Sequence, residues 1–259
     1  LAYCVFKSTK INFIDTPGNS NFISDIPGVL RVVDGLVFVI SAPDGLQFYT
    51  EKIWKWADEL ELPRIIFLNK MDHERANAAL VIDSIKTKLK KTPIFITLPQ
   101  GAGENFSGIV DLIENKYYSY INGGDGKGKQ VEVPADILDE MEISHAELME
   151  AVAEVDDELI EKYLESGELT EEDFSQGLKE GIQKRKLIPV LCGSAIQNIG
   201  VDLMLEAAVK YLPSPENRLP VEAKKIDDES EIKRSAGRNE PTSALVFKTV
   251  ADPYAGKLT

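Results

Sequence analysis

Three short clusters of polar and small residues directly follow apolar runs in this sequence. They are Asp15-Thr16-Pro17-Gly18, Asn69-Lys70-Met71-Asp72 and Cys192-Gly193-Ser194-Ala195. Ligands in open α/β sheets bind outside the carboxyl ends of the strands, so clusters in these positions are candidate binding residues. Each cluster alone is a weak signal, and the first is also a plausible turn. An Asn-Lys-x-Asp directly after a buried strand is much more specific, and the three clusters in this order indicate one nucleotide-binding site.

The second and third clusters suit the recognition of guanine. Guanine presents adjacent N–H donors on its Watson–Crick edge, and one carboxylate, that of Asp72, accepts both. Adenine lacks this pair, and a site that leaves a buried carboxylate unpaired rejects the wrong base by roughly 10⁴-fold. We expect Asn69 to bind the base carbonyl region or to brace neighbouring loops, and the Lys70 stem to lie on the flat base. Ser194 and Ala195 are expected to offer backbone N–H groups to the base oxygen that adenine lacks.

The first cluster suits the phosphate end of the same ligand. Asp15 is expected to hold Mg²⁺ through water, and the Gly18 N–H group to meet the γ-phosphate. Pro27 falls where a helix should begin, and proline is tolerated only in the first turn of a helix. We therefore expect residues Asn19 to Ile26 to be irregular and mobile, as in a segment that γ-phosphate and Mg²⁺ order.

Four apolar runs, separated by segments of helical periodicity, must position these clusters. The runs are Ile11–Ile14, Leu36–Ile40, Ile65–Leu68 and Ile188–Leu191. Runs that are apolar on both faces are typical of strands buried between helix layers, as in parallel sheets. Helical spacings follow the later runs, at Ile53, Trp56, Ala57 and Leu60, at Ala78, Ile82, Ile85 and Leu89, and at Val201, Leu205, Ala208 and Leu212. Strands that alternate with helices predict a doubly wound, mostly parallel α/β sheet.

Residues 93–186 interrupt this alternation and predict an inserted α+β subdomain. Strands are expected at Ile94–Leu98, Gly108–Leu112, Tyr117–Ile121 and Gln130–Val133, and helices at Ala135–Glu154, Asp157–Leu164 and Glu171–Lys186, the last capped by Thr170. From Glu132 to Glu180 the chain carries 18 acidic and 2 basic residues, within a whole chain of net charge −14. This acidity is either a solvated helical face or a docking surface for a basic protein partner. It argues against direct nucleic-acid contact there, because phosphate binding needs clustered Lys and Arg.

Both ends of the sequence indicate incomplete units. Ala2–Lys7 is expected to pair with Ile11–Ile14 as an antiparallel hairpin, so the chain begins inside a fold and its N-terminus is interpreted as truncated. Pro213–Pro241 lacks periodicity and is interpreted as a linker, and Ser243–Val250 resumes a strand pattern that is interpreted as the first strand of a further domain. The expected domains are residues 1–92 with 187–213 for the nucleotide-binding domain, 93–186 for the insertion, 214–241 for the linker and 242–259 for the further domain.

These motifs together resemble the guanine-nucleotide-binding domain of bacterial elongation factor G, and especially of elongation-factor-G-like paralogues. The resemblance is carried by Ile14–Gly18, Arg31-Val32-Val33-Asp34-Gly35, Pro63–Asp72, Gly108–Leu112, Asp156–Leu164, Cys192–Ala195, Tyr211–Pro215, Phe247-Lys248-Thr249 and Ala251-Asp252-Pro253-Tyr254. It implies a P-loop-type translational GTPase of the ribosome with GTP/GDP and Mg²⁺ as ligands, and a β-barrel as the further domain. It also implies that the acidic insertion faces the ribosomal stalk protein, which favours the docking interpretation.

Two departures from that family's pattern matter. Gly123 to Lys129 fits the letters of a phosphate-binding loop, but Gln130 follows where a Mg²⁺-binding Ser or Thr is required, so we interpret this stretch as a flexible hairpin turn. We expect the true loop and the first switch upstream of Leu1, so this chain alone should bind GTP poorly and hydrolyse it negligibly. Asn19 occupies the position of the family's water-positioning His, which makes it the candidate catalytic residue, although Asn cannot carry positive charge.

Two functions of different classes remain open. The first is the GTPase region of an elongation-factor-G-like factor that hydrolyses GTP during the elongation phase of protein synthesis. The second is a guanine-nucleotide-dependent, ribosome-binding module in which hydrolysis is weak or lost. An adenine-nucleotide ATPase is disfavoured by Asp72. No apolar run approaches the ~18–20 residues of a membrane span, and Cys4 and Cys192 are interpreted as buried free thiols, so we expect a cytoplasmic protein without disulfides.

Overall fold

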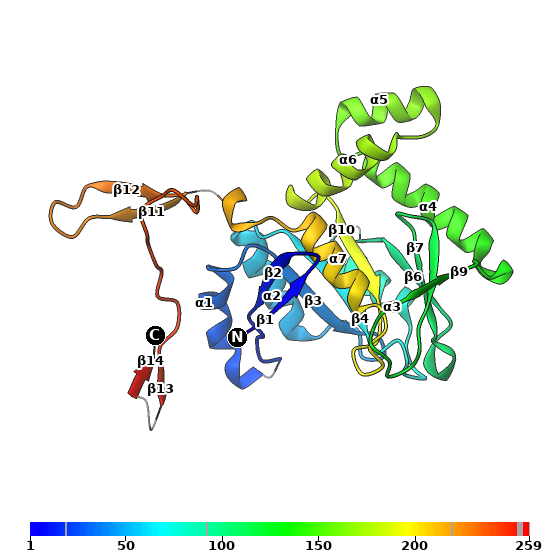
Figure 1. Ribbon diagram of the computed structural model, residues 1–259, viewed down its shortest axis with the longest axis horizontal. Helices are drawn as coiled ribbons and strands as arrows, with labels where there is room; N and C mark the ends of the chain where they lie inside the picture. Colours follow the sequence, from blue (N-terminus) through cyan, green and yellow to red (C-terminus); the bar gives the residue numbers. More distant parts are fainter. Residues whose placement is uncertain (19, 92, 219, 253–255, 259) are drawn as a thin grey trace.

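The computed structural model describes residues 1–18, 20–91, 93–218, 220–252 and 256–258 (Figure 1). Its strands are β1 (Ala2–Phe6), β2 (Thr9–Phe13), β3 (Leu36–Ser41), β4 (Arg64–Asn69), β5 (Pro93–Phe95), β6 (Thr97–Gln100), β7 (Gly108–Asp111), β8 (Lys116–Ser119), β9 (Lys129–Val131), β10 (Ile188–Cys192), β11 (Val221–Lys224), β12 (Glu231–Arg234), β13 (Val250–Asp252) and β14 (Gly256–Leu258). Its α-helices are α1 (Ile26–Leu30), α2 (Phe48–Glu59), α3 (Ala78–Ser84), α4 (Leu138–Ala153), α5 (Asp157–Ser166), α6 (Glu171–Gln183) and α7 (Val201–Tyr211). None of the helices within these residues has the length and apolar character that crossing a bilayer requires.

A four-stranded parallel sheet in the order β3-β4-β10-β5 forms the centre of the protein. Strand β10 is buried at every position and β4 at all but its last residue, which explains why both sequences are continuously apolar. Helix α7 packs against α6 and β1, while α2 packs against α1 and the π-helical turn Ile85–Leu89 that continues α3. The prediction of an α/β fold with a parallel sheet is therefore confirmed for Leu36–Ile40, Ile65–Leu68 and Ile188–Leu191.

The first apolar run does not belong to that sheet. Strand β2 pairs antiparallel with β1, Cys4 lying opposite Ile11, and the two strands form a sheet of their own. The predicted hairpin is confirmed, but the expectation that Ile11–Ile14 joins the parallel sheet is wrong for the described residues. The reason lies in its pattern, because β2 is half-buried at alternate positions rather than on both faces. Cys4 is accordingly only half-buried, whereas Cys192 is buried in β10, and both are free thiols as predicted.

A second, antiparallel sheet in the order β6-β7-β8-β9 follows the parallel one. The single strand expected at Ile94–Leu98 is divided, because Pro93–Phe95 pairs parallel with β10 and Thr97 begins the antiparallel sheet. The buried side chains Ile109 and Leu112 belong to the same hydrophobic core as the parallel strands. The two sheets therefore share one core, and helices α4, α5 and α6 follow in the chain.

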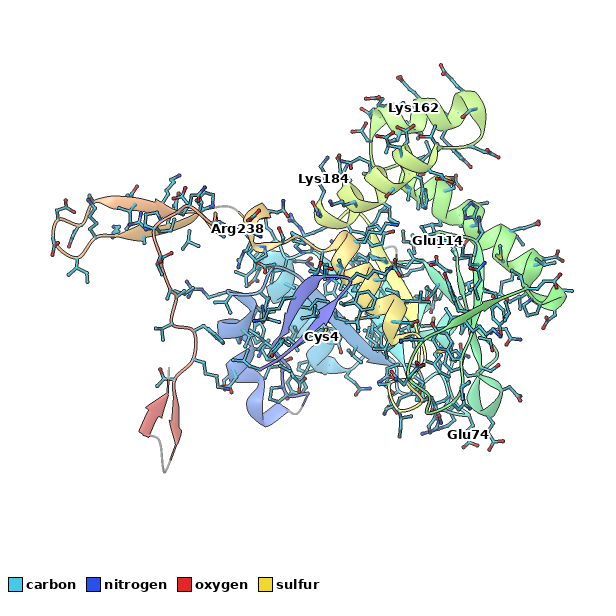
Figure 2. All side chains as sticks on the ribbon, in the orientation of Figure 1. Cys4, Glu74, Glu114, Lys162, Lys184 and Arg238 are labelled. Carbon is cyan, nitrogen blue, oxygen red and sulfur yellow. The ribbon has the colours of Figure 1, made fainter. Side chains whose placement is uncertain are left out.

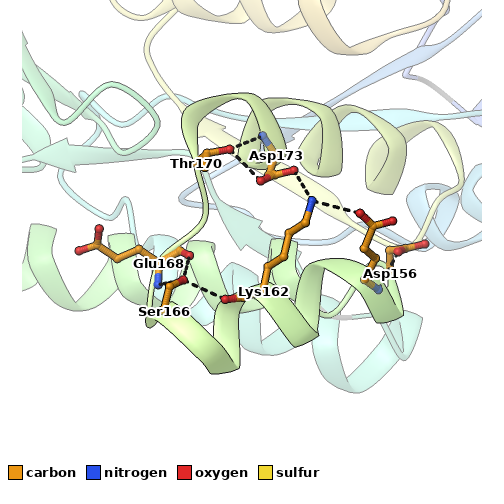
Figure 3. A network of polar contacts seen from close by, with 7 residues as sticks. Asp156, Lys162, Ser166, Glu168, Thr170 and Asp173 are labelled. Atoms are coloured by element: carbon orange, nitrogen blue, oxygen red, sulfur yellow. Dashed lines mark hydrogen bonds and ion pairs between the residues drawn. The ribbon is translucent and has the colours of Figure 1, made fainter.

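The acidic helices α5 and α6 are joined by a small polar network (Figure 3). The Nζ atom of Lys162 lies 3.1 Å from Glu158 and 2.9 Å from Asp173. Thr170 caps α6 as predicted, since its Oγ1 accepts a hydrogen bond from the backbone N–H of Asp173 at 3.1 Å. The Thr170 hydroxyl also donates to the Asp173 carboxylate at 2.8 Å. Lys162 and then Thr170 lower the pKa of the Asp173 carboxyl below its usual value.

Replacing Thr170 with Ala is expected to lower the free energy of unfolding by about 1 kcal/mol, the usual cost of losing an N-cap. The loss leaves the first turn of α6 without its side-chain acceptor and frees the Asp173 carboxylate from one of its two partners. Urea denaturation measures this change. Thr242→Ala, at an exposed position outside regular structure, is the matched control. Equal stability of the two variants would show that the cap contributes nothing.

The chain beyond residue 213 differs from its predicted organisation. The segment interpreted as a linker contains an exposed antiparallel hairpin, β11–β12, which extends away from the parallel sheet (Figure 1). The strand expected at Ser243–Val250 is not formed, because residues 243–249 lack regular structure and the strand begins only at Val250, paired with β14. Most of these residues are exposed. One contact returns to the main body, where Lys248 Nζ lies 2.8 Å from Asp25.

The segment after the first polar cluster is more regular than expected. Asn19 lies outside the described residues, and Ser20–Asp25 forms a 3₁₀ helix where an irregular stretch was predicted. Pro27 falls in the first turn of α1, as its missing N–H group requires. The prediction of a helix that begins around Pro27 is therefore confirmed.

Candidate functional site

Three neighbouring strands of the parallel sheet end at one edge and place polar loops there. In the β3–β4 pair Ser41 lies opposite Asn69, and in the β4–β10 pair Leu68 lies opposite Cys192. Because the strands are parallel and in this register, the loops that follow β3, β4 and β10 start side by side. The clusters predicted after β4 and β10 are brought together by the sheet, and a loop after β3 joins them.

The side chain of Asn69 ties two of these loops together. Its Oδ1 accepts hydrogen bonds from the backbone N–H groups of Lys70 at 2.8 Å and of Ala195 at 2.9 Å. The backbone adds a further link, since the Met71 N–H group donates to the carbonyl of Gly193 at 3.1 Å. Of the two roles considered for Asn69, the structure shows the bracing of neighbouring loops. The loop after β4 is thereby fixed relative to the loop after β10.

Gly193 is needed where the loop after β10 passes close to Phe67 of β4. A Cβ atom at this position would lie 2.4 Å from the Phe67 ring and 2.5 Å from the carbonyl oxygen of Ile199. The Phe67 side chain is buried and the carbonyl belongs to the backbone, so neither has room to move aside. The absence of a side chain at Gly193 therefore serves the approach of the loop to the sheet.

The backbone of Ser194 has a structural role that the sequence did not reveal, because it pairs with Ile199. Its N–H group donates to the carbonyl of Ile199 at 3.0 Å, and the Ile199 N–H group donates back at 2.9 Å. The Ser194 side chain is fully buried and accepts from the Gln197 N–H group at 3.2 Å. The Ser194 N–H group is therefore engaged within its own loop, as the Ala195 N–H group is with Asn69, and donation by either group to a base oxygen stays a prediction. The Ile196 N–H group, two residues on, makes no hydrogen bond within the described part of the chain.

Asp72 has the feature that recognition of a base requires. Its Oδ1 atom is buried and has no hydrogen-bond partner within the described residues. A buried carboxylate oxygen without a donor costs free energy, and a ligand N–H group removes that cost. The adjacent N–H donors of guanine match a carboxylate in this state, so the residues present fit a guanine base. Glu74, two residues after Asp72, is labelled in Figure 2 and shows that this site lies far from Lys162 on the acidic helices.

Lys70 is held by the loop that follows β3. Its backbone is in the left-handed region with φ 64°, and its Nζ lies 3.5 Å from the Asp44 carboxylate. Asp44 also accepts a hydrogen bond from the Ser41 hydroxyl at 2.5 Å. The Ser41 hydroxyl, and to a smaller extent Lys70, lower the pKa of the Asp44 carboxyl. Asp44 thus fixes the end of the Lys70 side chain, although about half of that side chain is exposed.

Sequence reasoning missed Asp44 although the signal was present. Ser41 and Asp44 follow the apolar run of β3 in the same way that Asn69 and Asp72 follow β4. The rule that ligands bind beyond the carboxyl ends of parallel strands applies to all three strands.

The first cluster lies at the end of the β1–β2 hairpin. Asp15, Pro17 and Gly18 are exposed and Thr16 is half-buried. Within the described residues this cluster forms no hydrogen bond with the other two. Mg²⁺ commonly takes one or two carboxylates together with ligand phosphates and water, so the single exposed carboxylate of Asp15 fits part of such a donor set. No group of three or more His, Cys, Asp or Glu side chains in the described part of the chain could hold a metal ion by itself.

Comparison with known proteins adds a family match. Residues 1–214 match the family described as "Elongation factor Tu GTP binding domain". The chain is 38% identical over 255 residues to elongation factor G of Thermotoga petrophila, and 38% identical over 255 residues to that of Thermotoga maritima. Each alignment covers 98% of this chain and 37% of the relative, so the chain spans just over a third of the length of these relatives.

A solved structure resembles the whole fold. A crystal structure of a Thermus thermophilus protein superposes with a TM-score of 0.81 at 29% sequence identity. The superposition covers 99% of this chain and 35% of that one. The similarity therefore extends over the parallel sheet, the antiparallel sheet and the acidic helices together.

Proposed function

This chain belongs to the family of elongation factor Tu GTP-binding domains, and from that premise we propose that it forms the guanine-nucleotide-binding part of an elongation-factor-G-like translational GTPase. The protein binds GTP and GDP and acts on the ribosome in the cytoplasm during the elongation phase of protein synthesis. The whole activity belongs to a protein in which this chain is one part.

The observation that carries the proposal is the unpartnered Oδ1 atom of Asp72, next to a loop pair that Asn69 holds together. The Asp72 carboxylate accepts the two N–H groups on the guanine edge. The Lys70 stem, fixed at its end by Asp44, lies along the base. The Ala195 loop approaches the base oxygen, with the Ile196 N–H group in place of that of Ser194 as the donor.

The residues of the first cluster, Asp15 to Gly18, bind the phosphate end of the nucleotide. Asp15 holds Mg²⁺ through water, and the ion neutralises charge on the phosphates when bound. Thr16 and Pro17 shape the turn that brings the Gly18 N–H group to the γ-phosphate. Asn19 then follows as the residue that orients the attacking water.

The domain organisation and the partners are part of the same proposal. Residues 1–92 and 187–213 form the nucleotide-binding domain, residues 93–186 an inserted subdomain and residues 242–259 the start of a β-barrel. The acidic helices α4 to α6 of the insertion form the surface that receives the ribosomal stalk protein. The charge of the insertion supports this docking surface, since residues 132–180 carry 18 acidic and 2 basic side chains.

Equilibrium competition against a fluorescent GDP tests the nucleotide assignment in the full protein. We expect GDP to displace the probe at a concentration at least ~100-fold lower than ADP, because adenine leaves the Asp72 carboxylate unpaired. Displacement by ADP and GDP at equal concentrations, or an absence of probe binding, would overturn the proposal.

The role of Asn19 in GTP hydrolysis distinguishes the two functional classes. Replacing Asn19 with His in the full protein is expected to raise ribosome-stimulated GTP turnover about tenfold, because an imidazole orients and polarises the attacking water better than a shorter, uncharged amide. Phosphate release in the presence of ribosomes measures this. Unchanged turnover with intact GTP binding would favour the alternative, a guanine-nucleotide-dependent ribosome-binding module without effective hydrolysis.

A further inference from the structure

The glycine-rich turn between β8 and β9 lies against the loop that follows β10. Two backbone groups of the turn are engaged there, since the Gly123 N–H group donates to the carbonyl of Gln197 at 3.1 Å and the carbonyl of Gly124 accepts from the Asn198 side chain at 3.3 Å. This is the stretch whose letters resemble a phosphate-binding loop. In the structure this stretch contacts Gln197 and Asn198 of the loop after β10.

Asp202, in the first turn of α7, holds the two ends of this turn. Its Oδ1 accepts a hydrogen bond from the Tyr120 hydroxyl at 2.8 Å, and its Oδ2 accepts from the Gly128 N–H group at 3.1 Å. Hydrogen bonds to a carboxylate are stronger than those between neutral groups. Tyr120 is buried, and this burial together with the neighbouring Asp202 carboxylate raises the pKa of its phenol. The phenol is therefore a permanent donor to Asp202 at physiological pH.

Glycine is required at two positions of the turn, where the backbone comes close to Asn198 and to Tyr120. Gly126 has φ 75°, and a Cβ atom there would lie 2.5 Å from the Asn198 side chain. A Cβ atom on Gly128 would lie 2.8 Å from the Tyr120 ring. Gly126 thus allows the turn to approach the loop after β10, and Gly128 allows it to approach Tyr120. The turn is thus anchored, which corrects the expectation that it is flexible.

The anchored turn reaches the base-binding residues through one short loop. Gln197 and Asn198, which the turn holds, directly follow Ile196, whose N–H group makes no hydrogen bond in the described structure and is the donor to the base oxygen in the proposed site. The other end of that loop is fixed by Asn69 through the Ala195 N–H group. The loop is therefore held from the parallel sheet on one side and from the antiparallel sheet on the other.

We propose that Tyr120 and Asp202 form a clasp that positions the loop after β10, so that the antiparallel sheet sets the preference of the site for a 6-oxopurine. The inference rests on the proposed guanine-binding function and names two positioning residues of that site. Release of the clasp leaves Asp72 unchanged and lets the Ile196 amide move away from the base oxygen. Nucleotide binding in turn stabilises the clasp, because the coupling of two equilibria is reciprocal.

Two diphosphates distinguish this effect from a general loss of structure. GDP carries both the oxygen at position 6 and the amino group at position 2, whereas the diphosphate of 2-aminopurine riboside keeps only the amino group. In the full protein, Tyr120→Phe and Asp202→Asn are each expected to raise the Kd of GDP about tenfold, the effect of one lost hydrogen bond to a charged or positioned group. The Kd of the 2-aminopurine compound should stay within about twofold. Tyr118→Phe is the matched control, because it removes a hydroxyl from the adjoining strand β8 and this hydroxyl makes no hydrogen bond in the described structure.

Hydrogen exchange of the nucleotide-free protein provides a second measurement. Peptides that cover residues 193–200 should exchange faster in Tyr120→Phe and Asp202→Asn than in the wild type and in Tyr118→Phe. Unchanged exchange, or an equal weakening of both diphosphates, would overturn the clasp. A wild type that binds no GDP would overturn the proposed function instead, and the exchange rates would still decide whether the clasp holds the loop.

Discussion

Replacing Asp72 with Asn is expected to lower the affinity of the full protein for GDP by about a thousandfold and to raise its affinity for XDP. The carboxylate has a buried Oδ1 without a partner among the described residues, so it contributes most when a base supplies N–H donors. Two hydrogen bonds to a charged acceptor are worth on the order of 4 kcal/mol together, which is about three decades in Kd. Xanthine carries an oxygen where guanine carries the amino group, and the amide of the variant donates to that oxygen. Fluorescence competition with both diphosphates measures the change.

Glu74→Gln is the matched control for this substitution. It removes a negative charge two residues away from Asp72, at an exposed position, and leaves the buried carboxylate in place. We expect its Kd for GDP to equal that of the wild type. A variant Asp72→Asn that keeps the preference for GDP over XDP would show that Asp72 does not contact the base.

The strand-end rule explains why so much of the site follows from sequence. Continuous apolar runs identify buried parallel strands, and the carboxyl ends of such strands lie at one edge. Asn69 and Ala195 are 126 positions apart and yet share a hydrogen bond, because β4 and β10 are neighbours. The same rule places Asp44 in the site, since Ser41 ends the adjacent strand.

Other features depend on contacts that no local pattern contains. The hydrogen bond of Tyr120 to Asp202 joins positions 82 apart, one in the turn after β8 and the other in helix α7, and periodicity describes these two segments separately. The engagement of the Ser194 N–H group by Ile199 depends on a tight loop, and apolar or polar character does not predict it. The pattern of Ile11–Ile14 predicts the wrong sheet, because four residues cannot distinguish a strand buried on both faces from half of an amphipathic hairpin.

The buried side chain of Arg64 connects the helix layer to the strand that carries the site. Its guanidinium is almost fully buried, lies 2.9 Å from the Asp58 carboxylate and stands over the Trp54 ring at 4.7 Å. It also donates to the carbonyls of Leu62 and Trp54 at 3.1 and 3.4 Å. Burial lowers the pKa of Arg64, and the Asp58 carboxylate opposes this effect. The start of β4 is thereby fixed to α2, while its other end carries Asn69.

Replacing Arg64 with Ala is expected to lower the free energy of unfolding by about 3 kcal/mol, because two carbonyls lose their donor and a side chain packed on the Trp54 ring is removed. Arg64→Met keeps most of the apolar stem, so its cost should be smaller and isolates the contribution of the guanidinium. Arg238→Ala, at a position that is 94% exposed, should leave stability within about 0.5 kcal/mol of the wild type. Urea denaturation of the three variants measures these differences. If Arg64→Ala were as stable as Arg238→Ala, the buried guanidinium would not hold β4 to α2.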